Sequence, residues 1–300
     1  IPQLRGPYVS RPMEKIVAEV RDLAARGVRE INLIAQDSTY YGIDLYGEQR
    51  LAQLLTALNE VPGVHWLRLF YAFPQQLNAP IIEALASLPK VCKYVDLPLQ
   101  HGSDRILRAM RRPERRDSIR RLIAQLRSLM PEVSLRSTFI VGFPGETEAD
   151  FQDLVALVRE LELDHVGVFQ FSPEPGTPAA ELPDQVPAAV KEERYHRLLQ
   201  VQQEISRRRL RRFIGRHLEV LVEGQAQYDA EEAAAGAHGS DLPVLMYGRH
   251  QGQAPDIDGV VLFTPAGEQP PEPGQLVTVE ITETADYDLI GVEVPGKGRQ

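Results

Sequence analysis

The stretch LRSTFIVGFPGET, residues 135–147, decides the fold of this chain. Residues 135–141 form a stretch of strand length that ends in three apolar residues, and Gly142 and Gly145 then supply a tight turn. Glu146 and Thr147 open a helical pattern that continues to residue 161. A strand that passes through a short glycine turn into a helix is one βα unit, so the stretch predicts such a unit.

The same βα order repeats over residues 1–172. The other strand-length runs are residues 31–35, 66–73, 93–97 and 165–171, and the other helical patterns are residues 14–26, 51–58, 81–88 and 105–129, the last as one helix or two. This alternation predicts an α/β fold, in which helices pack outside a parallel sheet. A barrel or open barrel is favoured over a doubly wound sheet, because no glycine-rich fingerprint follows the first strand.

The pattern changes beyond residue 172. Residues 173–187 are proline-rich and predict a linker, and residues 188–214 predict a long helix with a basic end that stops at Gly215. Short β segments at residues 218–222, 259–263, 276–281 and 288–294 predict a small antiparallel barrel, and residues 230–239 a low-complexity loop. We therefore expect three parts, over residues 1–172, 173–216 and 217–295.

Charge is distributed unevenly along the 300 residues. The net charge is −9, and residues 216–300 carry 15 acidic side chains against four Lys and Arg. Such a segment disfavours a nucleic-acid phosphate backbone and suits a basic partner, although a solvated acidic surface explains the charge equally well.

The cysteine count and the hydropathy limit the classes of protein to which the chain can belong. Cys92 is the only cysteine, which excludes an internal disulfide and a cysteine metal site of normal ligand number, so we expect it to act as a small buried hydrophobe. No apolar run approaches the roughly 20 residues that a membrane helix needs. We expect a cytoplasmic protein with no membrane contact.

Polar side chains follow the ends of three predicted strands, where ligands bind in βα barrels. The candidates are Gln36, Asp37 and Ser38 after the first strand, Gln100, His101 and Ser103 after the third, and Arg136, Gly142 and Gly145 in and after the fourth. Each has an ordinary structural explanation: the Asp and Ser residues as caps, the glycines as turn formers, His101 as a hydrogen-bonded histidine. Spacing alone therefore predicts a barrel with a polar mouth and no particular reaction.

Four motifs indicate a reaction, because they resemble the motifs of a known enzyme family. Residues 36–42 (QDSTYYG), 97–103 (LPLQHGS), 135–147 and 171–178 (FSPEPGTP) resemble motifs of the radical S-adenosylmethionine (SAM) methylthiotransferase family. The resemblance covers nearly the whole chain, with a TRAM-like small barrel at residues 217–295. It implies a partial parallel (β/α) barrel of the TIM-like radical SAM type, of which residues 1–172 lack the first strand and the cluster loop.

The resemblance also implies a SAM site. The residues that it places there are Gln36, Asp37, Gln100, Ser103, Arg136, Ile140, Val141, Gly142 and Gly145. Arg136 would reach the SAM carboxylate or ribose, Asp37 the methionyl amine, and Ile140 and Val141 the adenine. Neutral amides and one arginine suit a cation with a zwitterionic end.

The family reaction implies two 4Fe–4S clusters, an electron donor and SAM. The opening run, residues 1–12, resembles the sequence that follows the CxxxCxxC cluster loop of the family, but the cysteines themselves are absent. We expect the chain to be a piece of a longer protein. By itself it should hold no cluster, contribute no metal ligand or catalytic residue, and turn nothing over.

Within the family, the chain resembles the branch that methylthiolates the β-carbon of an aspartate in small-subunit ribosomal protein S-twelve. Asp37 stands where the tRNA-modifying branch tends to have Asn, and residues 94–101 and 182–194 have the protein-modifying form. The acidic tail suits a basic ribosomal protein docked on the small barrel. Two alternatives stay open: a tRNA (adenosine) methylthiotransferase, and a non-catalytic module that docks the ribosomal protein.

Overall fold

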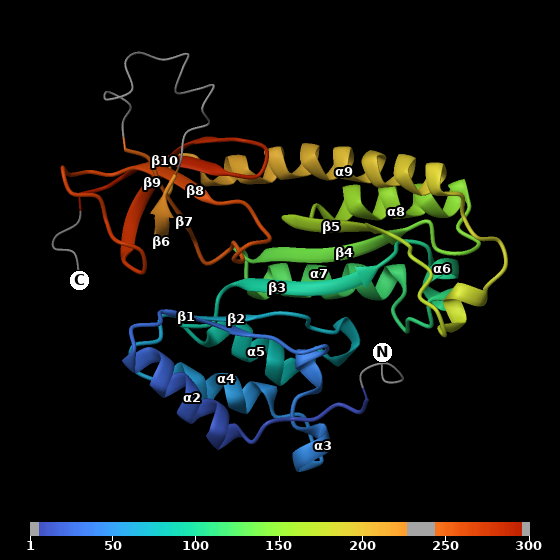
Figure 1. Cartoon of the computed structure of the whole chain (residues 1–300), viewed down its shortest axis with the longest axis horizontal. Helices are drawn as coiled ribbons and strands as arrows, with labels where there is room; N and C mark the ends of the chain where they lie inside the picture. The colour runs from blue at the N-terminus through green and yellow to red at the C-terminus, as the bar shows by residue number, and fades with distance from the viewer. Residues whose placement is uncertain (1–5, 227–243, 296–300) are drawn as a thin grey trace. The chain divides into compact units, whose positions relative to one another are not determined.

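The computed structural model of the chain describes residues 6–226 and 244–295 (Figure 1). These residues form two compact units that divide between Ile205 and Ser206, and each unit has its own hydrophobic core. The loop predicted over residues 230–239 and the start of the opening run lie outside the described residues. No helix in the described ranges combines the length and the apolar character needed to cross a membrane.

The strands of the first unit are all parallel. They are β1 (Glu30–Leu33), β2 (Trp66–Leu69), β3 (Tyr94–Gln100), β4 (Ser134–Val141) and β5 (His165–Gln170). One sheet pairs β1 with β2, and the other holds β4 between β3 and β5. The N–H of Ala72 donates to the carbonyl of Asp96 at 2.9 Å and links the loop after β2 to β3. The predicted α/β fold with a parallel sheet is confirmed.

Helices follow the strands in the predicted order. They are α2 (Met13–Ala25), α3 (Ile43–Tyr46), α4 (Leu51–Asn59), α5 (Ala79–Ser87), α6 (Asp104–Ala109), α7 (Arg116–Leu129), α8 (Glu148–Leu161) and α9 (Ala188–Leu210). The pattern over residues 105–129 gives two helices, because the chain turns through Arg111, whose φ of 56° no helix allows. Thr147 and Asp150 form a capping box that starts α8.

Burial alternates along the central strand β4. Ser137, Phe139 and Val141 are fully buried, whereas Arg136, Thr138 and Ile140, which point to the opposite side of the sheet, are only half-buried. In α9, buried Arg194, Leu198, Gln202 and Ile205 fall at helical spacing. The side of β4 that carries Thr138 and Ile140 is therefore partly accessible, whereas Asp96 on β3, beside Arg136, is fully buried.

The second unit is a closed barrel of five strands. They are β6 (His217–Gln225), β7 (Met246–Arg249), β8 (Val261–Thr264), β9 (Leu276–Thr284) and β10 (Leu289–Glu293). Four pairings are antiparallel as predicted, but β8 and β10 pair in parallel. The sequence patterns missed the short, glycine-containing β7. Strand directions cannot alternate all the way round a closed ring of five, so the fifth strand forces one parallel pair.

Candidate functional site

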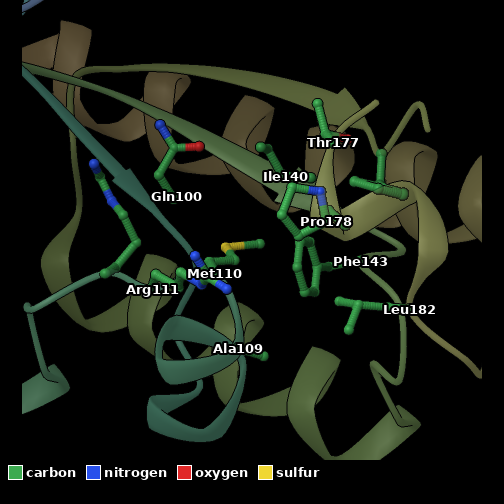
Figure 2. A pocket seen from close by; sticks show the side chains of 12 residues that line it. Gln100, Ala109, Met110, Arg111, Ile140, Phe143, Thr177, Pro178 and Leu182 are labelled. Atoms are coloured by element: carbon green, nitrogen blue, oxygen red, sulfur yellow. The ribbon is translucent and has the colours of Figure 1, made fainter. Parts of the chain in front are cut away.

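A pocket of about 690 Å³ lies in the first unit at the carboxyl ends of β3 and β4. Its lining residues are Gln100, Ala109, Met110, Arg111, Arg112, Ile140, Phe143, Phe171, Thr177, Pro178, Ala179 and Leu182. Figure 2 shows Gln100, Met110 and Arg111 on one side of the pocket, and Ile140, Phe143, Pro178 and Leu182 on the other. The pocket therefore offers one polar, cationic wall and one apolar wall, at a size suited to a small organic ligand.

The predicted SAM-site residues divide into two groups. Gln100 and Ile140 line the pocket, and the Val141–Gly145 turn brings Phe143 to it. Four others, Gln36, Asp37, Ser103 and Arg136, are not among the lining residues. For all nine predicted residues, including those that line the pocket, a role at the SAM site stays a prediction.

The loop after β1 has its own hydrogen bonds. Gln36 is exposed, and the Asp37 carboxylate accepts the Thr39 N–H at 3.0 Å, which caps a short 3₁₀ turn. Asp37 thus acts as the cap that its residue type allows.

Ser103 is buried, and its hydroxyl donates to the Asp150 Oδ1 at 2.7 Å. Burial alone would raise the pKa of Asp150, but hydrogen bonds from Arg105, Thr147 and Ser103 outweigh burial and hold that pKa below its ordinary value. The side chain of Ser103 therefore ties α6 to the start of α8.

A second buried network surrounds Glu146, directly after the glycine turn. Its Oε2 accepts the Gly142 N–H at 2.8 Å and lies 3.2 Å from the His101 Nε2, and its Oε1 accepts from the Arg194 Nη1 at 2.7 Å. The Ser103 N–H donates to the His101 Nδ1 at 2.9 Å, so the Nε2 carries the hydrogen that faces Glu146. This network holds the turn beside the pocket in place.

The glycine turn itself requires its glycines. Gly142 and Gly145 have φ of 74° and 78°, in the left-handed region. A Cβ at Gly142 would also lie 2.3 Å from the Lys191 Cγ. Gly142 is therefore required because the turn passes so close to Lys191 of α9 that no side chain fits there.

Arg136 belongs to a third buried group. Its Nη1 donates to the Asp96 Oδ1 at 3.1 Å, and the other Asp96 oxygen accepts the Tyr71 N–H at 3.1 Å. Tyr71 has a φ of 54°, which is uncommon outside glycine. Asp96 therefore fixes both the loop after β2 and the orientation of Arg136.

Sequence reasoning missed the cationic side of the pocket and the residues that reach it from the linker. Met110, Arg111 and Arg112 follow α6, and Thr177, Pro178 and Leu182 come from the segment before α9. The Met-Arg-Arg-Pro run was a possible signal, because a proline there ends the helical pattern and marks a loop.

The residues present do not fit an iron–sulfur cluster. Cys92, the only cysteine, is 2% exposed and precedes β3. Within residues 6–226 and 244–295, no three His, Cys, Asp or Glu side chains are grouped to hold a metal ion. A 4Fe–4S cluster needs several cysteine thiolates, so this chain supplies no such set.

Two family models match the chain. The model of the Radical SAM superfamily matches residues 1–158, and that of the TRAM domain matches residues 214–294. Because the first covers more than half of the 300 residues, the chain belongs to the radical SAM superfamily, whose members use SAM and 4Fe–4S clusters.

Among individual proteins, the chain is similar to two named "Ribosomal protein uS12 methylthiotransferase RimO". That of Anaeromyxobacter sp. (strain Fw109-5) is 48% identical over 97% of this chain and 58% of its own length, and that of strain K is 49% identical over 97% and 59%. The chain thus spans about three fifths of the length of these curated relatives. A solved structure, the radical SAM enzyme coproporphyrinogen III oxidase (HemN) of Escherichia coli, aligns over 81% of this chain and 62% of its own with 14% identity and a TM-score of 0.49.

Proposed function

We propose that this chain is the SAM-binding barrel and docking barrel of a radical SAM methylthiotransferase that modifies an aspartate of ribosomal protein uS12, the S-twelve of the small subunit. The observation that carries the proposal is the 48% identity with the Anaeromyxobacter relative across both units. The pocket at the strand ends supports it, because ligands of parallel βα sheets bind at that edge.

SAM fits the pocket by size and by chemistry. The apolar wall around Ile140 and Phe143 suits the adenine ring, and the Gln100 amide offers both a donor and an acceptor to its polar groups. When bound, SAM supplies the methyl part of the methylthio group. Glu146 maintains the turn that carries Phe143, and Asp96 fixes the orientation of the Arg136 guanidinium.

The clusters and the electron donor of the family are assigned to parts other than this chain. The single buried Cys92 and the absence of a metal-ligand group in residues 6–226 and 244–295 support this assignment. We expect iron and sulfide analysis of the isolated chain, after anaerobic reconstitution, to give no stoichiometric cluster. A stoichiometric cluster would contradict this assignment.

The second unit is proposed to dock uS12. Glu219 and Glu280 lie on neighbouring strands, with Glu219 opposite Thr278 and Glu280 opposite His217, and neither glutamate is buried. Val292, opposite Glu280 on the other side, is 43% exposed. Carboxylates beside an apolar side chain suit a basic protein surface, whereas an acidic barrel repels the tRNA phosphate backbone.

A chimera tests the proposed function. This chain would replace the matching 58% of the Anaeromyxobacter relative, and the product would be incubated with SAM, a reductant, and either uS12 or tRNA. We expect mass spectrometry to detect one methylthio group on uS12 and none on tRNA. Modification of tRNA alone would establish the adenosine branch instead. Binding of uS12 without modification by the chimera, when the intact relative is active, would indicate a docking module.

A further inference from the structure

Two residues on the polar side of the pocket have a strained backbone. Among the described residues, six that are not glycine have positive φ, and two of them, Gln100 at 72° and Arg111 at 56°, line the pocket. Neither residue type favours the left-handed region. Such strain persists where the surrounding structure holds a side chain in a required place.

The two arginines of the cationic wall differ in their partners. Arg112 donates to the Pro98 carbonyl, its Nε lies 3.6 Å from the Glu114 Oε2, and its guanidinium stacks 4.3 Å from the centre of the Phe73 ring. Arg111 is exposed, and no hydrogen bond or ion pair reaches its guanidinium from residues 6–226 or 244–295. The Arg111 guanidinium at the pocket is therefore available to bind an anionic ligand, and its strained backbone conformation fixes where the side chain begins.

We propose that Arg111 recognises the side-chain carboxylate of the substrate aspartate, an inference that rests on the proposed function. A guanidinium matches a carboxylate with two parallel hydrogen bonds, which fixes the orientation of the bound side chain as well as its charge. The reacting β-carbon is bonded directly to that carboxylate. Holding the carboxylate at Arg111 would therefore keep the β-carbon at the cationic side of the pocket, with the apolar wall left to SAM.

The position of Arg111 in the fold favours the substrate carboxylate over the SAM carboxylate as its ligand. Arg111 lies outside the sheet, in the loop between α6 and α7, and is open to solvent. A side chain presented by a macromolecule approaches from that direction. Arg136, the candidate for the SAM carboxylate, lies within β4 and is only 12% exposed.

A double-mutant cycle in the intact 300-residue chain tests the inference. Calorimetry would measure the affinity of uS12, and of uS12 variants with each aspartate changed in turn to Asn, for the unaltered chain and for Arg111→Met. We expect Arg111→Met to weaken uS12 binding about ten- to a hundredfold. One Asp→Asn variant should show the same loss with the unaltered chain, and no further loss with Arg111→Met.

Three further variants complete the test. Arg111→Gly suits the positive φ and should reproduce the loss in a chain that folds without strain. Arg111→Lys should recover part of the affinity, because it keeps the charge but not the paired hydrogen bonds. Arg108→Met, an exposed arginine on α6 outside the pocket lining, should change nothing.

Two results would overturn the role of Arg111 and leave the proposed function standing: uS12 binding with no coupling to any aspartate, or a loss of SAM affinity while uS12 still binds. The second would assign Arg111 to the SAM site. Failure of the unaltered chain to bind uS12 at all would instead contradict the proposed docking function, and this inference with it.

Discussion

The two units use buried polar groups differently. In the first, Glu146 and Asp96 are buried beside the strand ends and hold loops through several partners each. In the second, the core around Val220, Phe263 and Val279 is apolar, and the barrel is closed. The second unit also has a buried polar clamp, in which Arg249 at the end of β7 donates to Glu223 and to the Gln253 carbonyl. Polar clamps thus shape a pocket between loops in the first unit, whereas in the second they secure one segment of a closed barrel.

The largest expected effect is on the packed core of the second unit. Phe263→Ala should lower the free energy of unfolding of that unit by about 3–5 kcal/mol, because a fully buried ring leaves a cavity. Urea denaturation would measure this loss, and Leu262→Ala, on a half-buried neighbour, is the milder control. If SAM affinity falls together with the stability of the second unit, the two units are not independent in the way that the comparison implies.

A substitution in a polar clamp of the first unit should lower the free energy of unfolding nearly as much. Glu146→Gln removes the charge that faces buried Arg194, and we expect a loss of about 3 kcal/mol in the free energy of unfolding. Glu193→Gln, which breaks the exposed pair with Arg197, should cost less than about 0.5 kcal/mol. Equal losses for both variants would refute the importance of the buried clamp.

The Asp150 clamp should show a pH dependence. Its hydrogen bonds hold the folded-state pKa below the ordinary 3.8, so its stabilisation is present above about pH 4 and is lost as the pH falls through the folded-state pKa. We expect Asp150→Asn to lower the free energy of unfolding by about 2 kcal/mol at pH 7, with a smaller difference from the unaltered chain at pH 3. Asp153→Asn, on an exposed pair with Arg116, is the control, and a difference that grows on acidification would contradict the assignment.

The smallest effect concerns strain. Gln100→Gly should raise the free energy of unfolding by about 0.5 kcal/mol, since relief of a left-handed strain is offset in part by the entropy of glycine. It should also weaken SAM binding about fivefold, because the amide is lost. Asp256→Gly, at a φ of 62° in the second unit, is the control and should relieve strain without changing SAM affinity. A similar loss of SAM affinity in that variant would contradict the assignment of the Gln100→Gly loss to the amide.

The elements of the chain were largely predictable because their signals are local. Periodicity indicated every strand of the first unit within a few residues, and a glycine turn marked the end of β4. The strand β7 was missed because four residues with a central glycine carry too little pattern. That one omission also hid the parallel pairing of β8 with β10.

The candidate site was predictable only in part. Gln100 was a candidate because it follows a predicted strand, where parallel βα folds bind their ligands, and Ile140 was a candidate only through the family resemblance; both line the pocket. Arg111 and Leu182 were not found, because they come from a loop and a linker whose path follows no period. Arg194 lies 48 residues from its partner Glu146, a separation at which sequence carries no distance information.

The sequence by itself determined the βα order of the first unit and the acidic character of residues 216–300, since periodicity is a local signal and charge is set by composition. The tertiary structure decided which side chains meet: that Glu146 joins His101 to Arg194, that Asp96 joins Tyr71 to Arg136, and that Arg111 lines the pocket. These contacts arise when distant segments pack against one another, and only the folded chain specifies that packing.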